Sequence, residues 1–418
     1  MTVEKKVPEI RFKEFSEQWQ SLSLDKITDV YDGTHQTPTY TNNGVMFLSA
    51  ENIRTLTSQK FISEKAFKEE FKVYPQKNDV LMTRIGDVGT ANVVETDDDK
   101  AYYVTLALLK YKQLSPYFLK SSIASPYVQK DIWLRTLHIA FPKKINMNEI
   151  KQVNVNCPTN SKESDKIGNY FQKLDNLIKQ HQKKHDKLSN IKKAMLEKMF
   201  PKQGETIPEI RFKGFSGEWE ESNLEKCTDL LTGNPFNSKE FTSEGFFLVR
   251  GMNVKRGYLD SSPDISEFWP SSKGLERYLL EPEDIVVQMD GALIGKSYAK
   301  IKSINLPAIL VQRVTRIRCS EVNSEFIYQY IQKDFLKHIS GIKTETAVPH
   351  LSLHDIRAFS IFLPEIEEQN SIGSYFQKLD ALINQHQQQI NKLNNIKQAC
   401  PVCQPKPEPV DFKITSKS

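Results

Sequence analysis

The chain has 418 residues, of which 39% are hydrophobic and 26% charged, and a formal net charge of +5. No apolar run approaches the ~18 residues that span a bilayer, so the composition predicts a globular protein and excludes a membrane protein. Residues 1–205 carry a net charge of +7 and the remainder −2. This mild basicity permits a polyanionic partner without requiring one.

The first residues, MTVEKKVPEIRF, contain lysines but no apolar segment after them, so we expect a cytoplasmic protein. The five cysteines are scattered and form no disulfide framework, in agreement with a reducing compartment. Cys400 and Cys403 form a lone CxxC, and a structural zinc site would need two more ligands at similar spacing. We therefore predict no metal site.

Two segments of the chain occur twice. Residues 7–19 read VPEIRFKEFSEQW and residues 207–219 read IPEIRFKGFSGEW. Residues 167–182 read IGNYFQKLDNLIKQHQ and residues 372–387 read IGSYFQKLDALINQHQ. Little is shared between these matched ends, which predicts two similar halves with a common frame and a divergent middle.

The divergent middle of each half has the pattern of an α+β domain. Segments rich in β-branched and aromatic residues predict strands over residues 45–49, 79–83, 102–109, 246–249, 285–289 and 309–317. Glycine and asparagine mark turns between them. Ser115 before Pro116, and Asn323 before Ser324 and Glu325, are typical helix starts, so a short helix is expected after each.

The second repeated segment predicts a long helix in each half. Apolar residues recur with alternating spacings of three and four, as in a coiled-coil seam. His181 and His386 occupy matching seam positions, where a polar residue either fixes the register or is simply solvated. At ~1.5 Å per residue the first helix would be roughly 50 Å long. The predicted interface residues are Ile167, Leu174, Leu177, Leu188 and Ile191 in the first helix, and Ile372, Leu379, Leu382, Leu393 and Ile396 in the second.

No HExxH, paired CxxC, GxSxG or nuclease carboxylate cluster is present, so we predict no catalytic residues. Polar turns instead favour recognition of nucleic acid, because their side chains suit base edges and phosphates. Each turn taken alone could be an ordinary solvated loop, but the paired placement in both halves favours binding. The candidate DNA-binding residues are Thr34, His35, Gln36, Thr37 and Arg84 in the first half, and Asn234, Asn237, Ser238, Lys239, Gln288 and Arg313 in the second.

Several motifs together resemble those of a known family. PEIRF near each start, GTHQTP followed by GVMFLSAENI, DVLMTRIGDVG, and the repeated IGxYFQKLDxLIxQHQ with KLSNIKKAML are similar to the specificity subunit of a type I restriction-modification system. The resemblance covers residues 7–399.

The resemblance implies a fold, a function and partners. The fold would be two similar α+β target recognition domains, separated by two long antiparallel coiled-coil helices and related by approximate twofold symmetry. Each domain would read one half of an asymmetric, bipartite site on double-stranded DNA. The subunit itself would be non-catalytic and bind no cofactor. Two methyltransferase subunits and the motor-nuclease subunits would carry S-adenosylmethionine, ATP and Mg.

The expected boundaries follow from the repeats. Domain 1 would span residues 1–160, the central helix 161–203, domain 2 residues 204–365 and the C-terminal helix 366–399. Four prolines lie between Pro401 and Pro409, so the second helix should end near Ala399 and residues 400–418 should be disordered.

Two other functions remain open from the sequence. One is a self-sufficient DNA methyltransferase or nuclease with an unrecognised site, which would transfer methyl groups or cut DNA as a single purified chain. The other is a DNA-binding adaptor outside restriction, which would purify without a stoichiometric methyltransferase.

Overall fold

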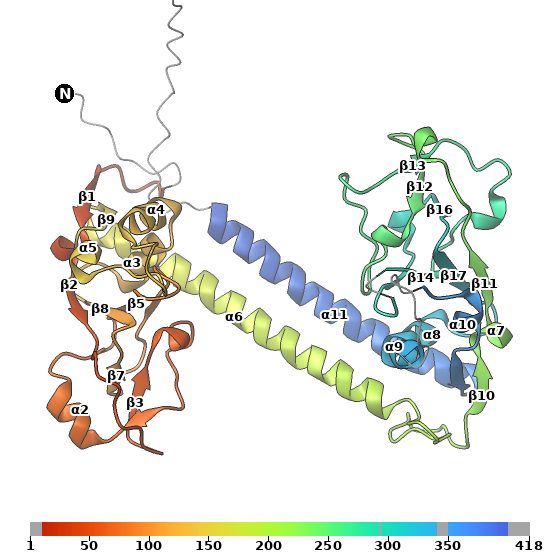
Figure 1. Ribbon diagram of the computed structural model, residues 1–418, viewed down its shortest axis with the longest axis horizontal. Helices are drawn as coiled ribbons and strands as arrows, with labels where there is room; N and C mark the ends of the chain where they lie inside the picture. The colour runs from red at the N-terminus through yellow and green to blue at the C-terminus, as the bar shows by residue number, and fades with distance from the viewer. Residues whose placement is uncertain (1–10, 292–293, 341–349, 400–418) are drawn as a thin grey trace, which may run out of the picture. The chain divides into compact units, whose positions relative to one another are not determined.

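A computed structural model describes residues 11–291, 294–340 and 350–399 of the chain. The chain divides into two compact units (Figure 1). Unit 1 comprises residues 1–181 and 388–418, and unit 2 comprises residues 182–387. Each unit contains one α+β domain and parts of two long helices. We call the α+β parts domain 1 and domain 2.

Domain 1 contains three small sheets. A four-stranded antiparallel sheet has the order β2-β8-β5-β6, a three-stranded sheet has the order β4-β3-β7, and β1 pairs with β9. β3 and β7 are parallel, whereas the other pairs are antiparallel. The strands are β1 Trp19–Ser23, β2 Asp29–Asp32, β3 Val45–Leu48, β4 Phe61–Ile62, β5 Val80–Thr83, β6 Ala91–Val93, β7 Lys100–Tyr102, β8 Leu106–Lys110 and β9 Asn154–Pro158.

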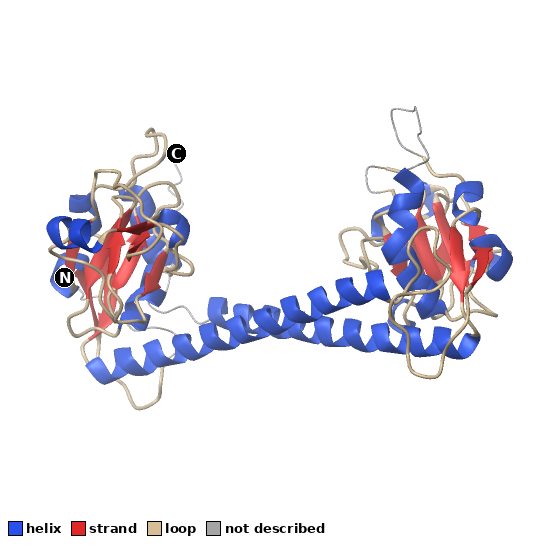
Figure 2. Ribbon diagram, turned by 90° about the horizontal axis from the view of Figure 1, so that it is seen from below, coloured by secondary structure: helices blue, strands red, loops and turns tan. Residues whose placement is uncertain are grey.

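Helices cover the strands of domain 1 (Figure 2). They are α1 Leu24–Ile27, α2 Glu64–Glu70, α3 Pro116–Ile123, α4 Pro126–Arg135, α5 Met147–Lys151 and the long α6 Ser161–Lys198. One core cluster joins the four-stranded sheet to α3, α4 and the first turns of α6, through residues such as Phe118 and Phe171. A second cluster lies between α2 and the three-stranded sheet.

Domain 2 repeats this sheet topology with different residues. The corresponding sheets have the orders β11-β17-β14-β15, β13-β12-β16 and β10-β18. β12 and β16 form the parallel pair, as β3 and β7 do in domain 1. The strands are β10 Glu220–Asn223, β11 Asp229–Thr232, β12 Phe246–Val249, β13 Phe268–Trp269, β14 Ile285–Gln288, β15 Tyr298–Lys300, β16 Ala308–Leu310, β17 Val314–Arg318 and β18 Ser360–Leu363.

The helices of domain 2 enclose the largest aromatic cluster of the described chain. Phe200, Trp219, Phe326, Tyr330 and Phe376 meet there with ring centroids 5.0–6.1 Å apart. The helices are α7 Leu224–Cys227, α8 Ser324–Tyr330, α9 Leu336–Ser340, α10 Leu353–Arg357 and the long α11 Ile366–Ala399, with a π-helical turn, η6, over Ile331–Phe335. The fold is therefore two α+β domains with long helices, as predicted.

The two long helices pack against each other and against the domains. In unit 1, Asp175 of α6 pairs with Lys397 of α11 at 2.7 Å, and in unit 2, Lys192 of α6 pairs with Asp380 of α11 at 2.6 Å. The later residue of α6 pairs with the earlier residue of α11, so the two helices are antiparallel. Eight predicted interface residues pack in the cores of their own units, namely Ile167, Leu174, Leu393 and Ile396 in unit 1, and Leu188, Ile191, Ile372 and Leu379 in unit 2.

Leu177 and Leu382 differ from that prediction. They occupy matching positions of the two repeats, yet their exposed fractions are 42% and 43%. Neither leucine lies on the buried face of its helix, because that face packs against the α+β domain and does not keep strict heptad spacing. Both leucines therefore present apolar surface to solvent.

Most local predictions are confirmed, and two strands need correction. Ser115 and Asn323 cap α3 and α8 by accepting the N–H of Phe118 and Phe326. The segments 102–109 and 309–317, predicted as single strands, each form two strands from different sheets. A turn closed by Leu106 N–H and Tyr103 C=O divides the first, and Arg313, at φ +68°, divides the second.

α11 is described as far as Ala399, the last residue of the described range, so the predicted end of this helix stays a prediction. The predicted disorder of residues 400–418 and the lone CxxC lie outside the described residues. Within the described ranges, no helix combines the length and apolarity needed to cross a bilayer.

Candidate nucleic-acid interface

The predicted DNA-binding residues of domain 1 gather where β2 ends. Residues 32–39, the first turn segment, leave β2 through Gly33 and run beside the residues that follow β7. Thr34 N–H donates to Tyr102 C=O at 3.1 Å, and Val104 N–H donates to Thr34 C=O at 2.9 Å. A Cβ at Gly33 would lie 2.4 Å from the carbonyl carbon of Tyr103, so only glycine fits this close approach.

Asp32 organises the polar side chains of this turn. One carboxylate oxygen accepts from Arg84 Nη1 at 2.5 Å and from the Gly33 N–H at 2.9 Å. The other lies 3.0 Å from Nε2 of His35. The Tyr102 hydroxyl donates to the Asp32 carbonyl at 2.8 Å, and burial together with the Asp32 charge raises the pKa of Tyr102. The carboxylate thus fixes the orientation of both the arginine and the histidine.

The five predicted residues of domain 1 differ in accessibility. His35, Gln36 and Thr37 are exposed and Thr34 is half-buried, so all four can meet a ligand. Arg84 is only 7% exposed, and its Nε–H also points to Ile145 C=O at 3.3 Å. In this structure Arg84 therefore supports the turn, while the other four residues form its surface.

Residues 232–239 of domain 2, the second turn segment, make the same backbone contacts as the first turn segment of domain 1. Asn234 N–H donates to Leu310 C=O at 3.1 Å, and Gln312 N–H donates to Asn234 C=O at 2.9 Å. A Cβ at Gly233 would lie 2.3 Å from the Val311 carbonyl, which repeats the close approach of Gly33. Asn237 caps a short 3-10 turn, η2 (Ser238–Glu240), by accepting the Lys239 N–H.

The ion pair beside the second turn segment is formed by residues at other positions than the Arg84–Asp32 pair of domain 1. Arg313 Nη1 lies 2.7 Å from Asp290 Oδ2, and the Arg313 side chain is 64% exposed. Gln288, at the end of β14, is half-buried two residues before that aspartate. Asn237, Ser238 and Lys239 are exposed. Domain 2 therefore presents an accessible arginine, whereas the paired arginine of domain 1 is buried.

The repeated segments of the chain make structural contacts and are not part of the candidate DNA-binding surface. In unit 1, Arg11 Nε and Nη2 donate to both carboxylate oxygens of Glu163 at 2.6 and 2.7 Å, and Trp19 Nε1 donates to Glu163 at 3.2 Å. In unit 2, Arg211 makes the equivalent fork to Glu368. Both glutamates are buried. Arg11 and Arg211 thus fasten each domain to the start of a long helix. Trp19 adds a hydrogen bond in unit 1, whereas the buried indole N–H of Trp219 has no hydrogen-bond partner among the described residues.

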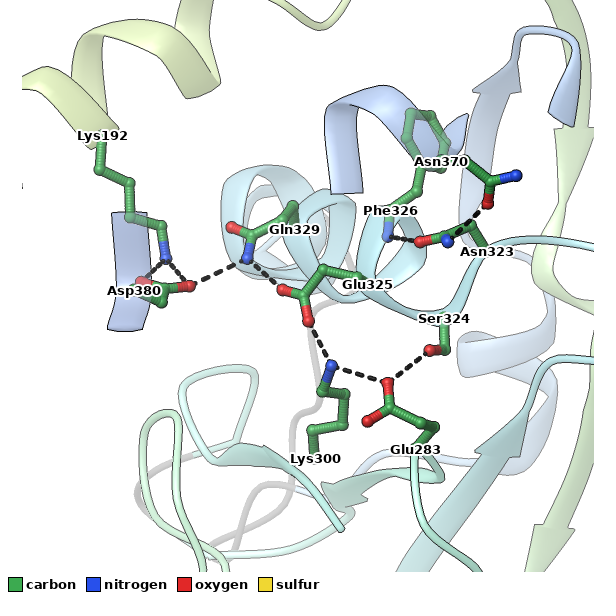
Figure 3. Close-up of polar contacts among 10 residues, drawn as sticks. All are labelled: Lys192, Glu283, Lys300, Asn323, Ser324, Glu325, Phe326, Gln329, Asn370 and Asp380. Atoms are coloured by element: carbon green, nitrogen blue, oxygen red, sulfur yellow. Dashed lines mark hydrogen bonds and ion pairs between the residues drawn. The ribbon is translucent and has the colours of Figure 1, made fainter. Parts of the chain in front are cut away.

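A polar network continues this attachment inside unit 2 (Figure 3). Gln329 of α8 donates to Asp380 of α11 at 3.1 Å and to Glu325 at 2.7 Å. Glu325 in turn pairs with Lys300 of β15, which lies 2.8 Å from Glu283. Burial alone would lower the pKa of Lys300, but the two glutamates raise it above its ordinary value. With the Lys192 pair, this network links the sheet to both long helices.

Unit 1 has a simpler link at the matching position. Asp175 of α6 pairs with Lys397 of α11 and with Lys120 of α3 at 2.8 Å. Burial alone would raise the pKa of Asp175, but the two lysines hold it below its ordinary value. In unit 1 the charged contacts therefore tie both long helices to α3, whereas in unit 2 the network also reaches β15.

No group of three or more metal-binding side chains occurs among the described residues. Asp32 and Asp290 were not among the predicted contact residues, although each orients one or two of them. A sequence signal existed, since each directly precedes a glycine at or just after the end of a strand, but their partners lie 52 and 23 residues away in the chain.

Fold and surface together define a class: two α+β domains, built on one strand topology, that carry different polar turns and are fastened to long antiparallel helices. Residues 216–395 match the model of the family described as type I restriction modification DNA specificity domain. The chain is 25% identical over 367 residues to the MjaVIII specificity subunit of Methanocaldococcus jannaschii, covering 81% of this chain and 79% of that one.

Two further comparisons agree. The EcoAI specificity subunit of Escherichia coli is 29% identical over 217 residues, covering 50% of this chain and 35% of that one. The crystal structure of a type I restriction-modification S subunit from M. genitalium has the same fold, with a TM-score of 0.68 at 14% identity, covering 94% and 97% of the two chains. Residues 216–395 thus match the DNA specificity domain family, and the chain is similar in sequence to type I restriction-modification specificity subunits.

Proposed function

We propose that the chain selects the DNA target of a type I restriction-modification complex, with each domain reading one half of an asymmetric, bipartite site. The observation that carries this proposal is the contrast between frame and surface. The strand order and the glycine at the turn are the same in both domains, but the side chains presented there differ. Two unlike readers on one frame would recognise two unlike half-sites.

The exposed groups suit the two kinds of contact that such a reader needs. His35, Gln36 and Thr37 in domain 1, and Asn237 in domain 2, can donate to or accept from base edges. Lys239 and Arg313 are exposed cations suited to phosphates, whose neutralisation supplies salt-dependent affinity. Base contacts would set the sequence and phosphate contacts the register.

The long helices would dock two methyltransferase subunits. Leu177 and Leu382 support this because they are exposed apolar residues at matching positions of the repeat. An exposed apolar side chain in each copy provides two similar anchors, which suits two copies of one partner.

The chemistry would reside on the partners. The methyltransferase subunits would bind S-adenosylmethionine, and the motor-nuclease subunits would use ATP and Mg. This chain would be non-catalytic and act in the cytoplasm with double-stranded DNA as its ligand.

The test is a selection of DNA by the assembled complex. The chain is co-expressed with a type I methyltransferase subunit from the same organism, purified, and used to enrich duplexes from a random pool. We expect two short sequence blocks at a fixed spacing. Gln36→Ala should relax one base position of one block by about 1–3 kcal/mol. Lys239→Gln should weaken binding to all duplexes and reduce the salt dependence by about one phosphate contact.

Three outcomes would contradict the proposal. A chain that methylates or cuts DNA when purified alone would be an enzyme. A chain that purifies without the methyltransferase would favour an adaptor outside restriction. A Gln36 variant that changes both blocks equally would exclude independent readers.

A further inference from the structure

A short hairpin in domain 1, residues 137–144, exposes an unusual amount of apolar surface. Ile139 and Phe141 are fully exposed, and Leu137 is 40% exposed. Trp133 and Leu134, at the end of α4, are 60% and 65% exposed beside it. Single exposed apolar residues are common, but several in one short loop mark an interaction site.

This hairpin is fastened to the candidate DNA-binding surface. Leu137 N–H donates to Lys144 C=O at 2.7 Å, which closes the hairpin. Gly86 N–H donates to Lys143 C=O at 2.8 Å, and Ile145 N–H donates to Arg84 C=O at 2.9 Å. Because Arg84 also holds Asp32, the hairpin and the first turn segment share one support. Arg84 thus connects the hairpin through its backbone and the first turn segment through its side chain.

The charge around the hairpin selects the partner. Lys143 and Lys144 are exposed, and residues 136–148 contain no aspartate or glutamate. Cations beside apolar tips suit a ligand with phosphates outside and stacked apolar rings inside. Proteins that distort duplex DNA use this combination, with an apolar side chain wedged into the base stack and lysines on the flanking phosphates.

We propose that Ile139 and Phe141 form a wedge that enters the base stack of the half-site read by domain 1, while Lys143 and Lys144 contact its phosphates. This inference rests on the proposed function. Unstacking the half-site helps a partner enzyme reach a base, because a base must leave the stack before it can be modified. The hairpin would then contribute to modification of its own half-site and not of the other.

The test uses the complex of the full chain with its methyltransferase, and a duplex carrying the selected site. 2-Aminopurine replaces single bases in either half-site and reports unstacking by its fluorescence. The wild-type complex should raise the fluorescence in the domain 1 half-site. The double variant Ile139→Ser, Phe141→Ser should lose most of that rise and lower methylation of that half-site by roughly tenfold.

Matched variants separate a wedge from a general loss of folding or affinity. Ile304→Ser removes an apolar residue of domain 2 that is 88% exposed, and it should change nothing. Phe141→Leu should keep part of the fluorescence rise because it retains an apolar tip. Lys143→Gln with Lys144→Gln should reduce the salt dependence of binding but keep the unstacking signal.

The outcomes also separate this inference from the proposed function. A wild-type complex without sequence-specific binding would overturn both. Specific binding with the same fluorescence in the wild type and the double variant would overturn the wedge alone. Loss of the methyltransferase from the double variant would show that a protein, and not DNA, covers the hairpin.

Discussion

The sharpest test of the domain attachment is Glu163→Gln in unit 1. Glu163 is fully buried and accepts two N–H groups of Arg11 and the indole N–H of Trp19. The substitution preserves volume but removes the charge that the buried arginine requires. Breaking a buried ion pair from one side costs about 3–5 kcal/mol, and we expect about 3 because the glutamine oxygen still accepts one hydrogen bond.

The assay is hydrogen exchange of the backbone amides in β1 and β9, because Trp19 is the first residue of β1 and the two strands pair with each other. A loss of about 3 kcal/mol corresponds to roughly a hundredfold faster exchange when opening limits protection. Glu368→Gln should produce the same effect in β10 and β18 and leave β1 unchanged. Glu51→Gln, which removes the charge of an exposed pair with Lys60, serves as the control and should have no measurable effect.

Unchanged exchange in β1 and β9 of the Glu163 variant would refute the role of this pair. Equal acceleration in both units would show a global loss of stability instead of a local attachment.

Three further predictions concern the helices. Gly168→Ala should destabilise unit 1, because the new Cβ would lie 2.2 Å from Ser115 Oγ. The overpacking costs about 1–3 kcal/mol, which exceeds the roughly 1 kcal/mol gained in helix propensity. The melting temperature and hydrogen exchange in α3 measure this loss of stability, and an unchanged or higher melting temperature would contradict the prediction. Asp380→Asn should lower the stability of unit 2 by about 1.5–3 kcal/mol, because Lys192 and Gln329 lose a charged hydrogen-bond acceptor. The loss should appear as faster hydrogen exchange of the amides in α8. Equal protection in the variant and the wild type would argue against the network. Because the pKa of Asp175 is lowered in the folded protein, its ion pairs stabilise unit 1 fully at pH values above its unfolded-state pKa near 3.8. This contribution is lost as the pH falls through the lower pKa of the folded state. Unfolding measured from pH 5 to 2 should therefore depend less on pH in Asp175→Asn than in the wild type, and identical profiles would exclude the effect.

Repeated and local features of the fold were predictable from the sequence. The helices and their caps at Ser115 and Asn323 each depend on residues within a few positions of one another. The strands were less certain. Residues 102–109 contain no glycine or proline, so the pattern gives no sign that β7 pairs with β3 while β8 pairs with β5.

The surface was less predictable than the frame. Whether Arg84 meets solvent depends on Asp32, an acceptor 52 residues away, and nothing in the local sequence indicates that pairing. Leu177 and Leu382 satisfy a heptad pattern but lie outside the buried stripe, because each helix packs on its domain as well as on its partner helix. The hairpin with Ile139 and Phe141 was not predicted, since its exposure follows from the backbone contacts of Lys143 and Lys144.

The central claim is that two unlike readers on one scaffold choose two unlike half-sites. It is tested most directly by exchanging residues 20–155 for the corresponding segment of a related subunit and mapping methylated adenines across the genome of a host that carries the methyltransferase. We expect one half-site to change while the other half-site and the spacing stay the same. A change in both half-sites, or in neither, would contradict it.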